Sequence, residues 1–179
     1  FIKEDLGMLH KAESTMRRKR EELKNSRRKE MIGFRKIDPE VAMEKNTWFH
    51  LGRNSCEEIL YCLRRIADPC EEHVDNNFVP LSKEQVKEYI PLRDTVLFLL
   101  RRTEKILQTD SYDEVDEVRR EAEELKDCLE KAREAQMQRM QSSKENITVA
   151  YLYLNLLQET RELTSSLRHL LRASKGFRE

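Results

Sequence analysis

The chain has 179 residues, which is enough for one domain with a continuous hydrophobic core. Charged residues make up 38% of it, and Gly and Pro contribute only four each, which argues against a turn-rich β-sandwich and for solvated helix faces. Lys plus Arg and Asp plus Glu both total 34, so the overall charge gives no indication of bulk nucleic-acid binding.

The first predicted helix covers residues 2–36, where apolar residues form a thin stripe that weakens in its second half. Asp38 followed by Pro39 is typical of a helix start, because Asp caps free N–H groups and Pro lacks one. The second helix follows, with one face apolar along most of its length. Pro69 removes a helix hydrogen bond, so we expect a kink or a break near Ala67.

Capping patterns predict the starts of the remaining helices. Ser82 and Gln85 form a capping box before the third helix, which Pro91 is expected to kink. Two further Ser-x-x-Glu patterns predict the fourth and fifth starts; they are Ser111 with Glu114, and Ser142 with Glu145. In the fourth helix, apolar residues from Val115 to Ala132 form a narrow stripe of the coiled-coil type.

The fifth helix carries the widest apolar face, from Val149 to Leu171, and Gly176 lies where its C-terminal cap is expected. Short connections between long amphipathic helices favour antiparallel neighbours. The sequence therefore predicts an all-α fold, an up-and-down antiparallel bundle of about five long helices that forms one domain over residues 1–179. The second and fifth helices, which are the most apolar, are expected at its centre.

The cysteines show no CxxC spacing and fall in apolar helical patterns, so we expect them to be reduced and buried, as in the cytoplasm. They are Cys56, Cys62, Cys70 and Cys128. The sequence has no signal peptide and no run of ~18 apolar residues that could cross a bilayer. It begins at Phe1 without an initiator Met, from which we expect a fragment of a longer protein.

No catalytic motif is visible in the sequence. The four histidines are scattered and show neither HExxH nor Glu-x-x-His spacing, and Gly-rich phosphate loops are absent. A nucleophilic Ser or Cys would need a His and a carboxylate in reach, and no local pattern supplies them. We therefore expect no enzyme activity and no cofactor.

One group of acidic residues is a candidate metal site. Asp68 and Glu72 are four residues apart and project from one helix face, with Glu71, His73 and Asp75 close by. Hard oxygen ligands of this kind hold Fe, Mn, Mg or Zn on facing helices. The alternative is a solvated acidic patch at a helix end.

The charges are unevenly distributed along the chain. Residues 17–36 carry ten basic and three acidic side chains, whereas residues 110–134 carry eleven acidic and five basic ones. Either these two segments pair with each other, or the basic run binds anionic lipid head groups. That run consists of Arg17, Arg18, Lys19 and Arg20. No aromatic residues are interleaved with it, which argues against nucleic acid as a partner.

Residues Tyr61–Val74, which read Tyr-Cys-Leu-Arg-Arg-Ile-Ala-Asp-Pro-Cys-Glu-Glu-His-Val, resemble the core helix of phosphate-uptake regulator (PhoU-like) domains. Residues 73–85 and Tyr153–Leu171 are similar to the version fused behind the membrane domain of bacterial sodium-dependent phosphate cotransporters. The resemblance implies a PhoU-like helical bundle and an association with phosphate transport.

The chain departs from this family at the metal ligands that the resemblance implies. Arg64 stands where metal-binding members have a carboxylate four residues before Asp68. In the second half, Arg161 and Ser165 occupy the positions of the corresponding pair, although Glu159 and Glu162 lie nearby. These differences argue against a divalent or ferric metal.

The leading hypothesis is a regulatory domain on the cytoplasmic side of the inner membrane, which modulates sodium-dependent phosphate transport through helix-face contacts. Its partners would be the transmembrane domain of the same polypeptide, which would end just before Phe1, and the anionic membrane surface. One alternative is a scaffold or adaptor that forms a homo-oligomer through the stripe from Val115 to Ala132. Another is a metal-binding helical bundle.

Overall fold

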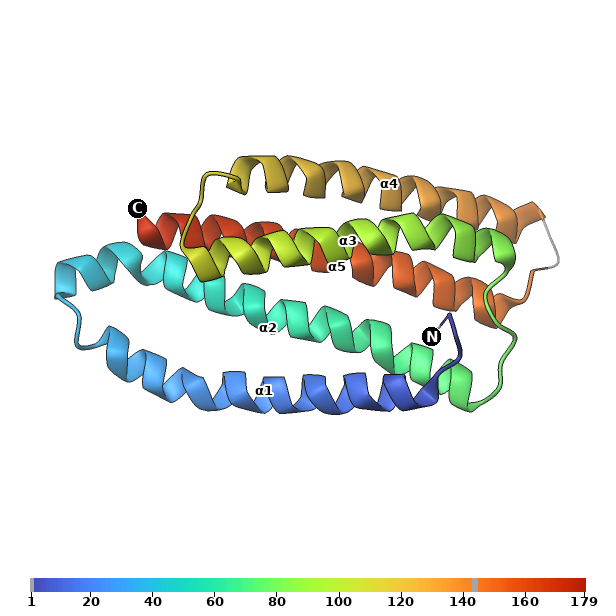
Figure 1. Cartoon of the computed structure of the whole chain (residues 1–179), viewed down its shortest axis with the longest axis horizontal. Coiled ribbons are helices and arrows are strands. Elements are labelled where there is room, and N and C mark those ends of the chain that lie inside the picture. The colour runs from blue at the N-terminus through green and yellow to red at the C-terminus, as the bar shows by residue number, and fades with distance from the viewer. Residues whose placement is uncertain (1, 143–144) are drawn as a thin grey trace.

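The computed structural model describes residues 2–142 and 145–179, which form five helices and no strand. The helices are α1 (Leu6–Phe34), α2 (Pro39–Asp75), α3 (Lys83–Thr109), α4 (Val115–Ser142) and α5 (Ile147–Arg178). Each helix runs antiparallel to the one before it (Figure 1). The predicted all-α, up-and-down bundle of five long helices is therefore confirmed.

Helix α5 occupies the centre of the bundle, because it contacts α2, α3 and α4. Leu156, Leu157 and Leu171 of α5 are fully buried. Helix α2 lies between α5 and α1, as Figure 1 also shows. Helix α1 contacts α2 alone among the helices, so one long side of α1 has no neighbour.

Two of the predicted helix starts are confirmed. The Asp38 carboxylate accepts hydrogen bonds from the first N–H groups of α2, with Pro39 at the first helical position. At the start of α3 the Ser82 hydroxyl accepts from the Gln85 N–H at 3.1 Å, and the Gln85 side chain accepts from the Ser82 N–H at 2.9 Å. These caps satisfy N–H groups that a helix leaves free at its N-terminus.

The other two predicted capping boxes are wrong. Helix α4 begins at Val115, and the Ser111 hydroxyl bonds to Asp113 in the preceding turn instead. The start of α5 is capped by Asn146, whose side chain accepts from the Val149 N–H. Glu145 accepts hydrogen bonds from the side chains of two buried residues instead, Gln85 and Gln136. The Glu145 carboxylate is therefore bound by side chains outside α5 and does not cap the start of that helix.

Helix α2 continues through Pro69, so the expected break near Ala67 does not occur. Proline has no N–H, which leaves the carbonyl of Arg65, four residues earlier, without its helix partner. Asn155 of α5 supplies the missing donor, with its side-chain amide 3.1 Å from that carbonyl oxygen. Helix α3 likewise continues through Pro91.

Gly176 lies inside α5 and does not cap it, which corrects the prediction from its position near the end of the chain. A Cβ atom at residue 176 would lie 2.6 Å from two ring carbons of Trp48. The ring of Trp48 therefore packs directly against the α5 backbone. Glycine is needed here for this close approach of α2.

The apolar stripe of α4 packs within the chain's own core. The buried members of the stripe are Val115, Val118, Ala122, Leu125 and Leu129. They face α3 and α5, the two helices that α4 contacts. This placement removes the stripe as a surface for pairing with another chain.

All four cysteines are free thiols. Cys62 and Cys70 are buried as expected, and burial raises the pKa of the Cys62 thiol to about 11 and that of Cys70 to about 12. Cys56 is half-buried and Cys128 is exposed, so burial of all four was a wrong expectation. Cys128 precedes Leu129 and lies off the buried stripe of α4.

Candidate functional site

The α1–α2 pair carries most of the predicted site residues, and Arg53 of α2 fixes the distance between the two helices. Its guanidinium donates to the Glu30 carboxylate of α1 and to the Leu23 carbonyl oxygen at 2.7 Å. It also lies 3.3 Å from Glu57 on α2. Only 8% of the Arg53 side chain is exposed, so these bonds are shielded from solvent.

Side-chain contacts at both ends of α1 complete its attachment to α2. Near the α1–α2 connection the rings of Phe34 and Phe49 stack with centroids 4.9 Å apart. Near the start of α1 the His10 ring lies 3.0 Å from the Glu71 carboxylate. Leu9 is the buried residue of α1, and the rest of the helix is half-buried or exposed. Helix α1 is thus held along one side by a few contacts.

Between these contacts α1 and α2 enclose a groove with a volume of about 720 Å³. Leu23 and Met16 of α1 and Leu60 and Tyr61 of α2 supply its apolar side chains. Its basic residues are Arg17, Arg20, Lys24, Arg27, Arg53 and Arg64, and its acidic residues are Glu13, Glu21, Glu57 and Glu58. The groove therefore offers charged and apolar contacts but no assembled catalytic group.

The predicted basic run is divided between two environments. Arg18 and Lys19 lie 2.6 and 2.7 Å from the two oxygens of Glu22, so this single carboxylate offsets one of their two positive charges within α1. These contacts hold the pKa of Glu22 below its usual value, chiefly through Lys19. Arg17 and Arg20 line the groove instead. The run is therefore not one continuous cationic patch.

The acidic segment of α4 does not neutralise α1, so the predicted pairing of the two segments is wrong. Arg102 of α3 lies within 3.0 Å of the carboxylates of Glu114, Glu117 and Glu121. Arg168 of α5 binds Glu123. Since α1 contacts only α2, the basic residues of α1 and the acidic residues of α4 lie on separate parts of the molecule.

The structure does not bring the candidate metal ligands together. Asp68 accepts a hydrogen bond from the Arg64 guanidinium at 2.9 Å, and Glu72 is exposed. Glu71 is paired with His10, and buried His73 lies 2.7 Å from the Val79 carbonyl oxygen. Within residues 2–142 and 145–179, no three His, Cys, Asp or Glu side chains are placed to hold a metal ion.

The second set of positions also lacks a ligand cluster. Arg161 lies 3.8 Å from both Glu130 and Glu162, and the Ser165 hydroxyl donates to the Arg161 carbonyl oxygen. Glu159 is buried and accepts from Arg65 of α2 at 2.7 Å. At both positions, then, basic side chains occupy the carboxylates: within α2 at Asp68, and between helices at Glu159 and Glu130.

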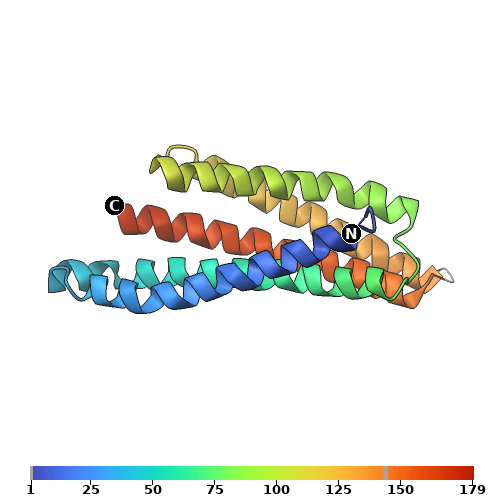
Figure 2. The ribbon, with the colours of Figure 1, turned by 60° about the horizontal axis from the view of Figure 1, so that its bottom comes forward.

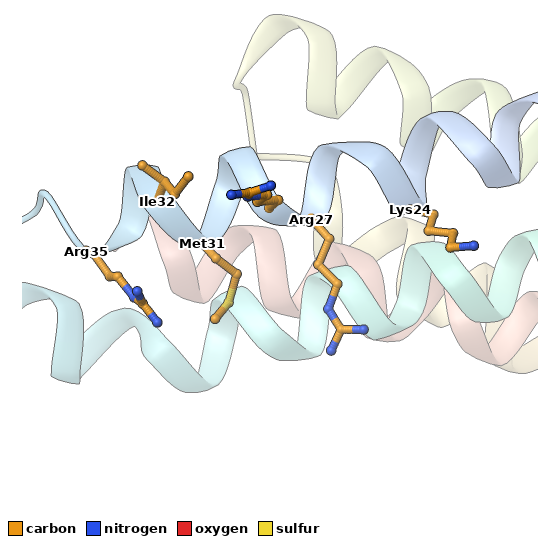
Figure 3. Close-up of a pocket in the computed structure, with 6 residues that line it drawn as sticks. Lys24, Arg27, Met31, Ile32 and Arg35 are labelled. Atoms are coloured by element: carbon orange, nitrogen blue, oxygen red, sulfur yellow. The ribbon is translucent and has the colours of Figure 1, made fainter.

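A further group of residues lies on the second half of α1, within the basic segment 17–36 but beyond the predicted basic run. It surrounds a shallow depression of about 480 Å³ (Figure 3), formed by Lys24, Arg27, Arg28, Met31, Ile32 and Arg35. Arg27, Met31 and Arg35 recur in steps of four on one side of the helix. The hints in the sequence were the excess of basic residues in segment 17–36 and the weak apolar stripe of this half.

Comparisons with protein-family models, with curated proteins and with solved structures found no match for this chain. Of the helices that the structure describes, none combines the length and the apolar character needed to cross a bilayer. The surface chemistry of α1 and α2 is therefore the main indication of function.

Proposed function

We propose that the chain is a regulatory domain on the cytoplasmic side of a sodium-dependent phosphate transporter. In this proposal it acts through contacts of the α1–α2 surface and carries out no chemistry. The observation that carries the proposal is the attachment of α1 to α2 alone, next to a groove of about 720 Å³. A helix held on one side can change its position when a partner occupies the groove.

The association with phosphate transport rests on the resemblance of Tyr61–Val74 to PhoU-like domains. This segment lies on α2, the helix between α1 and the central α5. Tyr61 and Arg64 of the segment line the groove, whereas Arg65 reaches Glu159 on α5. One stretch of α2 thus touches both the groove and the core. This arrangement suits a domain in which a partner bound in the groove changes the packing of α2 against α5.

Two other functions are less well supported. An adaptor that forms oligomers through α4 would need the stripe containing Leu125, but only 4% of Leu125 is exposed. A metal-binding bundle would need Asp68, which is bound to Arg64. Neither alternative has a surface of its own in the described residues.

The test measures sodium-dependent phosphate uptake in cells that express the transporter gene encoding this chain. Arg17→Glu with Arg20→Glu reverses two charges in the groove, and we expect it to change the uptake rate several-fold at equal protein abundance. The matched control is Arg101→Glu with Lys105→Glu, two exposed residues of α3 outside the groove. Equal uptake by all three proteins, or a gene with no membrane spans, would contradict the proposal.

A further inference from the structure

The second half of α1 and the turn that follows it carry cations that form no ion pair with any described residue. Among the described residues, none of these side chains takes part in an ion pair; they are Lys24, Arg27, Arg28, Lys29, Arg35 and Lys36. Two of the nearby acids of α1 are engaged elsewhere, Glu22 with Arg18 and Lys19, and Glu30 with Arg53, which leaves Glu21 beside these six cations. A concentrated positive field therefore faces solvent here.

Exposed apolar side chains lie among these cations and at the turn that follows. Ile32 is 46% exposed and Met43 is 84% exposed, and Met31, Ile37 and Val41 are exposed as well. Large apolar side chains grouped on a surface are a mark of an interaction site. We call residues 24–43, with these cations and apolar side chains, the α1–α2 tip.

The α1–α2 tip projects from the bundle. In Figures 1 and 2 the connection between α1 and α2 extends past the C-terminal end of α5. Helix α1 has no neighbour besides α2, so its outer side is not covered by the rest of the chain. A broad, flat partner can therefore approach the tip without a clash with α3, α4 or α5.

We propose that the α1–α2 tip docks on the surface of an anionic lipid bilayer. Its cations would bind the phosphate groups of the lipids, while Met31, Ile32 and Met43 enter the boundary between head groups and acyl chains. Exposed cationic and apolar side chains within one projecting segment are the combination that an interfacial segment needs. The chemistry does not depend on a role in transport.

The apolar residues distinguish a bilayer from a nucleic acid. Single-stranded nucleic acids bind to proteins by stacking bases on aromatic rings, in addition to phosphate contacts. The exposed apolar residues of the tip are aliphatic or Met, and Phe34 already stacks on Phe49. Aliphatic side chains gain nothing from phosphate groups but gain from leaving water at the lipid boundary.

The test is cosedimentation of the full chain with vesicles of phosphatidylcholine, with and without phosphatidylglycerol, at ~0.1 M salt. We expect binding to the anionic vesicles only. Arg27→Gln with Arg28→Gln should lower the partition coefficient about 30-fold, equivalent to about 2 kcal/mol. Met31→Gln with Ile32→Gln should lower it about tenfold or more, since two apolar side chains no longer insert.

Two matched controls test whether a loss of vesicle binding is specific to the α1–α2 tip. Arg101→Gln with Lys105→Gln removes two exposed cations from α3, and we expect no change in vesicle binding. Arg17→Gln with Arg18→Gln lies outside the tip and should reduce binding less than threefold. Circular dichroism checks that each variant keeps its helical content. An equal loss of binding in the three pairs of charge variants would show a non-specific charge effect and overturn the proposal.

Other outcomes would also overturn it. They are equal binding to neutral vesicles, no vesicle binding by the unmodified chain, or binding to a single-stranded oligonucleotide that competes with the anionic vesicles at equal phosphate concentration. Vesicle binding together with unchanged phosphate uptake by the groove variants would reject the proposed transport function and leave the lipid-docking proposal intact.

Discussion

The side-chain amide of Asn155 donates a hydrogen bond to the backbone carbonyl of Arg65, which is the carbonyl that Pro69 leaves without a helix donor. Asn155 lies on α5 and Arg65 on α2, so this bond joins the two helices at the point where α2 would otherwise be interrupted. The bond explains how α2 passes through a proline without ending.

We expect Asn155→Ala to lower the free energy of unfolding by about 1–3 kcal/mol, because a partly buried carbonyl loses its donor. In a Pro69→Ala background the restored N–H would satisfy that carbonyl, so the same substitution should cost about 1 kcal/mol less. Urea denaturation of the four proteins measures this coupling. Asn54→Ala, at an exposed position of α2, is the control. Equal costs in both backgrounds would contradict the explanation.

The second prediction concerns Gly176, where a Cβ atom would lie 2.6 Å from the Trp48 ring. Alanine is normally favoured over glycine in a helix by about 1 kcal/mol, but overcrowding here should outweigh that gain and leave Gly176→Ala less stable than the unmodified chain by about 1 kcal/mol. Gly33→Ala is the matched control, since a Cβ there meets nothing within 4 Å. It should raise the stability by up to about 1 kcal/mol, and thermal unfolding would distinguish the two signs.

The third prediction concerns the dependence of stability on pH. Glu88 of α3 accepts hydrogen bonds from Arg139 of α4 at 2.7 and 2.9 Å and from the Tyr153 hydroxyl of α5 at 3.0 Å. The Arg139 hydrogen bonds are the main cause of a lowered pKa for the Glu88 carboxyl. A lowered pKa in the folded state stabilises the protein above the unfolded value of about 4.3, and this contribution disappears as the pH falls through the folded value.

Glu88→Gln should therefore cost about 1 kcal/mol at pH 6, a modest amount because 30% of the Glu88 side chain is exposed to solvent screening. The difference from the unmodified chain should shrink at pH 3.5, where the Glu88 carboxyl of the unfolded chain takes up a proton. Urea denaturation at the two pH values measures the difference in the free energy of unfolding between the variant and the unmodified chain. Glu84→Gln is the control, since Glu84 is mostly exposed and lies 3.7 Å from Arg139. A pH-independent difference would exclude the carboxylate as its source.

The helices themselves could be predicted from the sequence because their signals are local. Apolar residues at helical spacing mark the buried faces of α2 and α5, and the capping box of Ser82 and Gln85 marks the start of α3. These patterns act within a few residues, so no knowledge of the tertiary structure is needed.

Three of the unmet predictions share a different cause, namely partners distant in the sequence. Glu145 fits a capping box but is taken by Gln85 and Gln136, and Gly176 fits a cap but accommodates Trp48. Pro69 predicts a kink or a break, and α2 continues without a break where Asn155 supplies the missing donor. In each case a side chain that is distant in sequence decides the outcome.

The same limit applies to the candidate site. The sequence shows that residues 17–36 are basic, but not which cations remain without a carboxylate. That depends on how the helices pack: α1 contacts only α2, so the acidic residues of α4, several of which pair with Arg102 or Arg168, lie away from these cations. The exposure of Ile32 and Met43 likewise follows from the absence of a neighbour on the outer side of α1.

The one-sided attachment of α1 divides the stability of the molecule into two levels. Separation of α1 from α2 breaks the Arg53 and Phe34 contacts but leaves α5 surrounded by α2, α3 and α4. The free energy of this local opening is therefore smaller than that of global unfolding, and a partially open form exists in equilibrium with the closed one. A ligand that prefers either form would change the balance without disturbing the hydrophobic core.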